Sequence, residues 1–320
     1  MSALEIISAG IATSIQDAGR FGMQRYGLAP SGALDRLSLA AANCLVGNSA
    51  FAPAMEIGPQ GIVVAAHDGP LRVAVTGALR ALDIDGHGKR LGQTITLANG
   101  KRLTLGMARD GVFGYLAIEG GIAATPVFGS CSVNAYAGLG SPYPRALQNG
   151  DRLTAQICAA WPHERAIDLP PQTADAFGVV MGPQADEFGD ACELFLNSQW
   201  RVSASSNRMG YRLEGPELKH RHGHNIVSDG TVDGSIQVAG NGQPIVLMKD
   251  RGTTGGYPKI ATVISADLGR LAQTRFGRTI RFEALSVEEA QARARAFHDL
   301  IGSLPGRIRS AAKPAPAASQ

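Results

Sequence analysis

Residues 244–264 read PIVLMKDRGTTGGYPKIATVI, with an apolar run at each end and a polar, glycine-rich segment between them. Runs of about five residues are typical of strands and too short for most helices. Glycine adopts the backbone conformations of tight turns without steric cost, so the middle of the stretch favours a reversal of the chain. The stretch therefore predicts two strands joined by a glycine-rich turn.

Short apolar runs of the same kind recur along the whole chain in two series. They lie at 62–66, 71–76, 94–97, 102–107, 115–118 and 152–157, and then at 177–181, 201–205, 235–238, 245–248, 260–264 and 279–282. The two series predict a mainly β fold, with one strand-rich domain in residues 1–160 and a second in residues 175–302. A proline-containing connection is expected over 161–174, and the Ala/Pro/Ser-rich end predicts a disordered tail over 303–320.

Helical periodicity is confined to a few segments. The clearest begins at Ser286, where Glu289 completes a capping box, and apolar residues then recur every three or four positions at Val287, Ala290, Ala294, Phe297 and Ile301. A second helical stripe over 37–45 stops at Gly47 and Asn48, which favour the left-handed conformation at a helix end. Residues 184–196 and 266–273 are weaker helix candidates. A few short helices are thus expected beside the strands.

Composition and charge exclude several classes of protein. Of 320 residues, 30 are basic and 27 acidic, and the charges are mixed throughout, so no basic stripe is present to bind nucleic acid. No apolar run approaches the roughly 18 residues of a membrane helix, and the N-terminus lacks a leader pattern. The four cysteines form no C-x-x-C pair, which disfavours zinc and a disulfide framework. We expect a cytoplasmic protein without nucleic-acid or membrane partners.

The glycine-rich turn is the first candidate for chemistry. Paired glycines let backbone N–H groups converge on an anion, and the hydroxyl and charged side chains around them can move protons or bind a small-molecule substrate. The candidate catalytic residues are Asp250, Arg251, Thr253 and Thr254, and the candidate substrate-binding residues are Gly255, Gly256, Tyr257 and Lys259. The alternative is a plain glycine-rich hairpin whose charges face water.

Arginine provides a second candidate substrate contact. Arg208 and Arg212 lie four residues apart, and the guanidinium of either could bind a substrate carboxylate with two parallel hydrogen bonds. We assign this role to Arg208. The alternatives for this segment are a structural ion pair between Arg212 and Glu214, or a solvated surface role.

The N-terminal region adds polar residues in turn-forming segments. Gln16, Asp17 and Arg20 are candidate substrate contacts with no obvious structural role. Ser31 and Asp35 are further candidates, and their alternative role is to cap the helix that follows them.

Other motifs predict no cofactor site. His220, His222 and His224 alternate, as metal ligands on a strand would, but the basic residues and glycine among them fit an exposed loop better, so no metal is assigned. The chain has neither a G-x-x-x-x-G-K-[ST] loop nor a G-x-G-x-x-G segment after a strand. Met248-Lys249 matches a biotin attachment pair, but a carrier would present it in a small separate domain.

Several of these stretches occur together in one order. They are Gln16 to Arg20, Ser31 to Asp35, Ala42 to Asn48, Gly120 to Ile122, Arg208 to Leu213 and Thr254 to Pro258. Together they resemble the family of the 5-oxoprolinase C subunit, also described as allophanate hydrolase subunit 2-like or biotin-dependent carboxyltransferase-like, from about residue 11 to residue 290. The resemblance implies two cyclophilin-like β-barrel domains, with the active groove between them or shared with the B subunit of the same enzyme.

The resemblance also implies a function. It predicts ATP-dependent opening of 5-oxoproline (pyroglutamate) to L-glutamate, in a complex with subunits A and B that uses ATP without a nucleotide motif in this chain. The alternatives are the carboxyltransferase part of a biotin-dependent urea carboxylase or urea amidolyase, and a non-enzymatic regulator of a histidine kinase. Biotin is expected only under the first of these alternatives.

Overall fold

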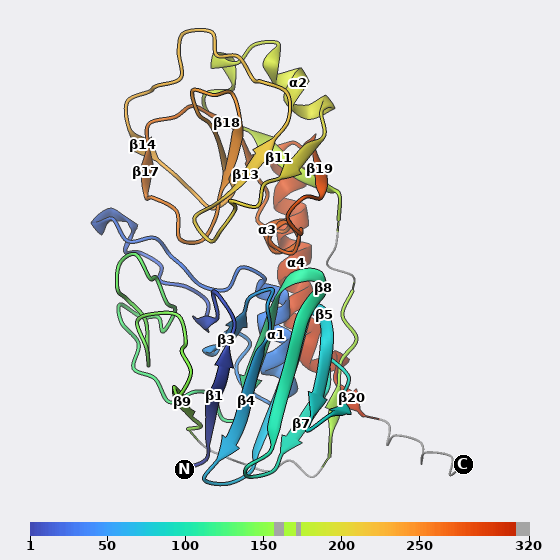
Figure 1. Cartoon of the computed structure of the whole chain (residues 1–320). Coiled ribbons are helices and arrows are strands. Elements are labelled where there is room, and N and C mark those ends of the chain that lie inside the picture. The colour runs from blue at the N-terminus through green and yellow to red at the C-terminus, as the bar shows by residue number, and fades with distance from the viewer. Residues whose placement is uncertain (157–162, 171–173, 312–320) are drawn as a thin grey trace.

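The computed structural model describes residues 1–156, 163–170 and 174–311. Two β bodies lie one above the other, and a long helix, α4 (Val287–Arg307), runs along both of them (Figure 1). The N-terminal half forms the lower body and the C-terminal half the upper one. The mainly β class predicted from the short apolar runs is confirmed.

The N-terminal body is one nine-stranded sheet. Six strands follow the order β2-β3-β8-β4-β1-β9, and the long strand β5 pairs with β6, β7 and β8, so the sheet curls instead of lying flat. Their bounds are β1 Ala3–Ala9, β2 Ser14–Gln16, β3 Ala54–Ile57, β4 Ile62–His67, β5 Leu71–Ile84, β6 His87–Gly88, β7 Thr94–Leu97, β8 Arg102–Ile118 and β9 Arg152–Thr154. The predicted strands 102–107 and 115–118 are both parts of β8.

The C-terminal body is a closed barrel in the order β11-β18-β15-β16-β13-β12-β19. The parallel pairing of β19 with β11 closes it, which leaves no open edge among these strands. Their bounds are β11 Ala176–Met181, β12 Trp200–Val202, β13 Gly210–Glu214, β15 Ser235–Val238, β16 Pro244–Leu247, β18 Lys259–Val263 and β19 Thr279–Ala284. Two short ribbons lie outside the barrel, β14 (Asp229–Gly230) with β17 (Thr254–Gly255), and β10 (Arg165–Ala166) with β20 (Arg309–Ser310).

The two helices predicted most clearly from the sequence begin where they are expected. The Ser286 hydroxyl accepts a hydrogen bond from the Glu289 N–H, and the Glu289 carboxylate accepts one from the Ser286 N–H, so the capping box of α4 is formed. Asp35 caps α1 (Arg36–Leu45), and the remaining helical segments are η1 Gln24–Tyr26, η2 Ala185–Glu187, α2 Ala191–Asn197 and α3 Leu268–Ala272. Within the described ranges, none of the helices has the length and apolar character needed to cross a membrane.

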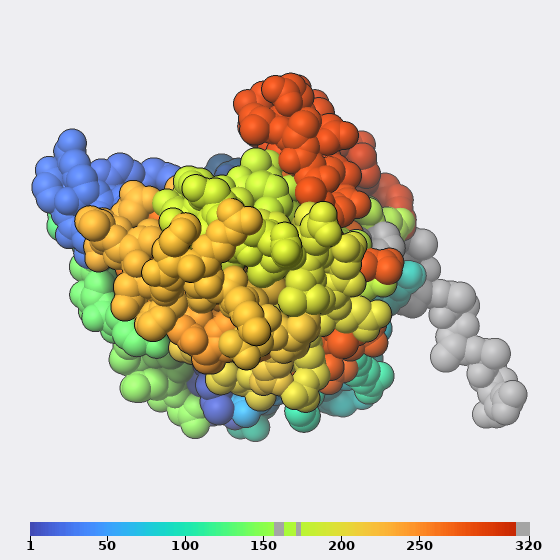
Figure 2. Space-filling model, turned by 90° about the horizontal axis from the view of Figure 1, so that it is seen from above, coloured from blue at the N-terminus to red at the C-terminus, as the bar shows by residue number. Residues whose placement is uncertain are grey.

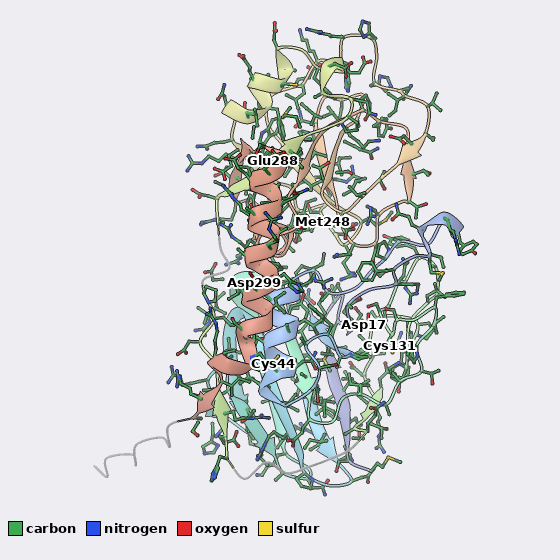
Figure 3. All side chains as sticks on the ribbon, turned by 180° about the vertical axis from the view of Figure 1, so that it is seen from behind. Asp17, Cys44, Cys131, Met248, Glu288 and Asp299 are labelled. Carbon is green, nitrogen blue, oxygen red and sulfur yellow. The ribbon has the colours of Figure 1, made fainter. Side chains whose placement is uncertain are left out.

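The apolar core does not divide along the two halves of the chain. One cluster lies on the inner face of the N-terminal sheet, with Leu4, Val64 and Leu116 fully buried. The other contains the barrel interior together with the apolar residues of α1, a helix of the N-terminal half. Cys44 on α1 and Asp299 on α4 mark these neighbouring helices in Figure 3. Helix α1 therefore joins the two bodies through buried apolar surface.

The tail prediction needs a correction. Helix α4 continues to Arg307, and residues 309–310 form β20 against Arg165–Ala166, so disorder starting at residue 303 is wrong for residues 303–311. The prediction was made from the polar composition of the segment, which gives no sign that Leu304 is buried. The side chain of Leu304 is fully buried in the cluster shared by α1 and the barrel. The predicted disorder of residues 312–320 lies outside the described residues, as do residues 161–162 and 171–173 of the predicted connection.

We expect Leu304→Ala to lower the free energy of unfolding by about 2–5 kcal/mol, because a fully buried leucine is replaced by a cavity. Arg295→Ala, on the exposed face of the same helix, is the matched control and should change it by less than about 0.5 kcal/mol. Chemical denaturation of both variants measures the difference. Equal stability of the two would contradict the packing of this segment.

Candidate functional site

The glycine-rich turn after β16 lies where the two bodies meet. The N–H of Ser31, in the N-terminal half, donates a hydrogen bond to the Lys249 carbonyl at 3.0 Å. Met248, one residue earlier, is labelled on the side of the barrel that faces the N-terminal body (Figure 3). The turn predicted from the sequence is thus at the junction, where side chains from both halves can meet.

Arg208 and Asp250 are brought together at this junction. The Arg208 Nε donates to Asp250 Oδ2 at 2.8 Å and its Nη2 donates to Asp250 Oδ1 at 3.1 Å, which is the two-pronged geometry that guanidinium and carboxylate favour. Nη2 also donates to the Gly32 carbonyl at 2.9 Å. Arg208 therefore binds a carboxylate of its own chain in the way the sequence predicted for a substrate.

Glu56 on β3 completes this cluster from the N-terminal sheet. Its Oε1 accepts a hydrogen bond from Arg208 Nη1 at 2.5 Å, and its Oε2 accepts from the Tyr115 hydroxyl at 2.7 Å and from the Leu34 N–H at 2.9 Å. Glu56 is fully buried. Sequence reasoning missed it, although a lone glutamate within the apolar strand Ala54–Ile57 is a signal, since buried carboxylates are nearly always paired.

The charges in this cluster do not cancel. Two carboxylates face one guanidinium, which leaves an excess of one negative charge if all three are ionised. Burial alone would lower the pKa of Arg208, but the charges of Glu56 and Asp250 outweigh it and raise that pKa above its usual value. Burial, and next the charge of Glu56, raise the pKa of Tyr115, so its hydroxyl remains a hydrogen-bond donor. The cluster is a fixed group of side chains with two acidic members and one basic member.

A cavity of about 330 Å³ opens beside Asp250 and Arg208. Most of its wall is apolar, with Val133, Phe113 and Phe276 among the lining residues. Asp250 and Arg208 supply its charged groups, and Ser14, Ser206 and Asn207 supply further polar atoms. A small, mostly apolar cavity with a few polar groups is the usual form of a small-molecule site.

Arg251, the next residue, lies in a different environment. Its Nη1 donates to Asp233 Oδ1, and Lys249 Nζ donates to Asp233 Oδ2 at 2.6 Å. Both basic residues line a second cavity of about 480 Å³, which does not include Asp250. Burial lowers the pKa of Arg251, and the charge of Asp233 opposes that effect. The sequence analysis grouped Asp250 with Arg251, but their side chains line two separate cavities.

The remainder of the turn forms a ribbon outside the barrel. Thr254 is exposed on β17, which pairs with β14, and the Thr253 carbonyl accepts the Thr231 N–H at 3.1 Å. Lys259 Nζ donates to Asp229 Oδ2 at 2.6 Å, and this lysine is 4% exposed. Gly255 packs so closely on Gln237 that a Cβ there would lie 2.4 Å from the amide nitrogen.

Gly256 and Tyr257 occupy the end of the same ribbon. The Gly256 carbonyl accepts the Ile226 N–H at 2.8 Å, and the Tyr257 carbonyl accepts the Gln237 side-chain amide at 3.2 Å. Tyr257 is 39% exposed. These contacts of Thr253 to Lys259 lie along the ribbon, whereas Asp250 and Arg208 lie at the junction.

Three N-terminal candidates hold a loop of their own half. The Asp17 carboxylate accepts hydrogen bonds from the Ser130 and Ser132 hydroxyls at 2.6 and 2.5 Å and from the Cys131 N–H at 2.6 Å. Asp17 and Cys131 are labelled close together in Figure 3. Arg20 donates to the carbonyls of this loop, at Val127, Ser130 and Ser132, and Gln16 donates to Val133 at 3.2 Å. Their observed contacts are structural.

Ser31 and Asp35 lie nearer the junction. Asp35 Oδ1 accepts the Ser38 N–H at 3.0 Å as the cap of α1, and Oδ2 accepts from the Gln273 amide at 2.8 Å. Burial raises the pKa of Asp35, and the hydrogen bonds from Ser38 and Gln273 oppose it. Ser31 is fully buried with a left-handed backbone, φ 54°. The capping alternative for Asp35 is therefore observed.

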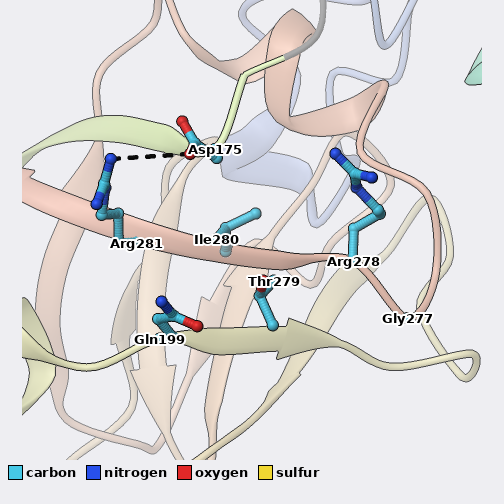
Figure 4. A pocket seen from close by; sticks show the side chains of 7 residues that line it. All are labelled: Asp175, Gln199, Gly277, Arg278, Thr279, Ile280 and Arg281. Atoms are coloured by element: carbon cyan, nitrogen blue, oxygen red, sulfur yellow. Dashed lines mark ion pairs between the residues drawn. The ribbon is translucent and has the colours of Figure 1, made fainter.

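Two other features lie apart from the junction. A cavity of about 260 Å³ lies beside β19. Figure 4 shows its lining residues, where Asp175 pairs with Arg281 at 3.7 Å and Arg278 immediately precedes the strand. Of the two alternatives for the Arg212 segment, the ion pair with Glu214 is not formed, because Glu214 binds Arg201, and Arg212 is exposed at the surface. In the described part of the chain, no group of three or more His, Cys, Asp or Glu side chains is placed to hold a metal.

Comparisons with known proteins assign the chain to a family. Residues 26–284 match the family described as carboxyltransferase domain, subdomain A and B. The chain is 41% identical over 288 residues to the C subunit of 5-oxoprolinase from Escherichia coli (strain K12), covering 90% of this chain and 93% of that relative. It is 30% identical to the urea amidolyase of Saccharomyces cerevisiae, covering 95% of this chain but only 18% of that longer protein.

Comparison with solved structures supports the same family assignment. The solved structure of the K. lactis urea amidolyase superimposes with a TM-score of 0.87 at 28% identity, over 99% of this chain and 22% of that one. A close match over almost the full length of a bacterial subunit, and a match to only one segment of a much longer enzyme, agree with the family assignment. The chain belongs to the carboxyltransferase domain family, subdomains A and B, and within it to the family of the 5-oxoprolinase C subunit.

Proposed function

We propose that this chain is one subunit of a cytoplasmic complex that opens 5-oxoproline to L-glutamate with the use of ATP. The 41% identity to a protein named as the C subunit of 5-oxoprolinase, over nearly the full length of both chains, is the observation that supports it most. The name of that relative implies further subunits, and we propose that subunits A and B are the partners of this chain.

The proposed reaction requires a base and hydrogen-bond donors that polarise the ring carbonyl of the substrate. The ring amide of 5-oxoproline resists hydrolysis because its carbonyl is stabilised by resonance, and transfer of a phosphoryl group to that oxygen gives a better electrophile. Proton transfer at the reacting amide then requires a fixed acid or base. Hydrogen-bond donors around the developing oxyanion stabilise it further.

Asp250 is the side chain best placed to act as that base. It lines the 330 Å³ cavity, it is 8% exposed, and two hydrogen bonds from Arg208 fix the orientation of its carboxylate. Since Arg208 already binds Asp250 and Glu56, we propose that it positions Asp250, in place of the substrate-binding role predicted from the sequence. Thr253 and Thr254 do not line this cavity, so we propose no donor role for them there.

Substrate identity separates this proposal from the urea-carboxylating alternative, which the similarity to urea amidolyases favours. The chain should be co-expressed with its genomic neighbours, and the purified complex supplied with ATP, bicarbonate and either 5-oxoproline or urea. We expect L-glutamate and ADP from 5-oxoproline and no carboxylation of urea. Biotin-dependent carboxylation of urea without glutamate release would establish the alternative.

We predict that the isolated chain is folded but has no measurable 5-oxoproline turnover, because it contains no recognisable nucleotide loop and its relatives are named as subunits. A melting curve and a glutamate assay on the same preparation test both parts. Full activity without any partner protein would overturn the subunit assignment.

A further inference from the structure

The second cavity carries more positive charge than its own acidic groups balance. Its lining includes three basic side chains, Arg36, Lys249 and Arg251, and among the described residues that line it one carboxylate, Asp233. Asp233 already binds both Lys249 and Arg251. A buried or partly buried charge without a partner costs several kcal/mol, so about two uncompensated positive charges favour occupancy by an anion.

Hydrogen-bond donors remain available in this cavity. Arg251 is 3% exposed, and within the described part of the chain its Nε has no hydrogen-bond acceptor. Arg36 makes one polar contact at the limit of hydrogen bonding, 3.5 Å to the Ala18 carbonyl. Its guanidinium lies 4.3 Å from the centre of the Phe51 ring, which fixes the side chain but uses none of its N–H groups.

The shape of the cavity suits a small ligand. Its walls come from α1, from the turn after β16 and from α4, with Phe297 and Ile301 of α4 supplying apolar surface. Gln24, on the loop that carries η1, also lines it and binds Arg251 through its amide oxygen at 3.3 Å. The loop of η1 projects beyond the barrel in Figure 2, with Tyr26 65% exposed. Gln24 therefore connects a projecting loop to the basic cluster.

We propose that this cavity binds a compact oxyanion, either a carboxylate or a phosphoryl group, between Arg36, Lys249 and Arg251. The Asp250 cluster lies on the other side of the same turn. Asp250, the proposed base, and Arg251, a member of the proposed anion site, are consecutive residues whose side chains line different cavities. Anion binding is measured on the isolated chain, so its outcome does not depend on whether the complex opens 5-oxoproline.

Calorimetric titrations of the purified chain with inorganic phosphate, 5-oxoproline and L-glutamate, at constant ionic strength, test the proposal. Binding of phosphate alone identifies a phosphoryl site, binding of the organic acids alone identifies a carboxylate site, and binding of both identifies a shared oxyanion site. If none of the three binds, the proposal is overturned.

Variants show whether the binding occurs in this cavity. Arg36→Met and Lys249→Met each remove one charge while keeping an apolar stem, and each should weaken binding about tenfold or more. Arg278→Met, at the exposed cavity of Figure 4, is the matched control and should leave binding unchanged. Wild-type affinity in both cavity variants would overturn the proposal.

Asp233→Asn should increase the affinity for the anion, so this test does not depend on a loss of binding. It removes the one carboxylate identified in the cavity lining, so it should tighten binding by about threefold or more even though two ion pairs are lost. A melting curve establishes that the variant is folded at the temperature of the titration. Unchanged or weaker binding by the folded variant would contradict the charge argument.

Discussion

Arg208→Met is expected to lower the free energy of unfolding by about 3–5 kcal/mol. The substitution keeps an apolar stem but leaves Glu56, which is fully buried, and Asp250 without the cation that both of them bind. Two neighbouring carboxylates without a counter-charge repel each other in a medium of low polarity. The substitution also removes one contact between the two halves, because Arg208 belongs to the C-terminal half and Glu56 to the N-terminal sheet.

Arg212→Met is the matched control for this prediction. Arg212 is exposed on β13, four residues from Arg208, and its replacement should change stability by less than about 0.5 kcal/mol. Urea denaturation of the two variants and the wild type gives both values. Similar stability of the two variants would show that the Glu56–Arg208–Asp250 cluster does not stabilise the junction.

Asp250→Asn is expected to reduce turnover of the reconstituted complex by about a hundredfold or more. The amide has nearly the shape of the carboxylate, but it cannot accept a proton and binds Arg208 more weakly. Turnover should therefore fall much more than substrate affinity. Steady-state kinetics of 5-oxoproline-dependent glutamate release separate kcat from KM.

Asp299 is exposed on α4. Asp299→Asn is therefore the control for the loss of one negative charge, and this variant should retain wild-type turnover. Melting curves of both variants are recorded beside the kinetics, because Asp250 also contributes to the buried cluster. A folded and fully active Asp250→Asn complex would remove Asp250 from the proposed site.

Much of the fold could be predicted from local patterns. Strands β7 and β15 have the bounds expected from their apolar runs, and the capping box at Ser286 forms. Strand β3 was missed because a glutamate interrupts its short apolar run. Its presence depends on pairing with β8, more than fifty residues later, and local sequence does not report such long-range pairing.

The candidate site could be predicted only in part. Arg208 and Asp250 came from separate motifs, and the structure joins them across 42 residues of sequence. Local reasoning placed Arg251 with Asp250 because they are neighbours, yet successive side chains in non-helical backbone commonly point in different directions. Asp17 was selected because the sequence shows no obvious structural role for it, but its carboxylate accepts hydrogen bonds from the loop at Ser130 to Ser132.

The most direct test of the proposed function is an addition experiment. Increasing amounts of this chain are added to a fixed amount of the partner proteins encoded beside it, in the presence of ATP and 5-oxoproline, and the rate of L-glutamate release is measured. We expect the rate to rise from the background and to saturate at a fixed ratio of subunits. A rate that stays at one value, whether or not the chain is present, would contradict the proposed function.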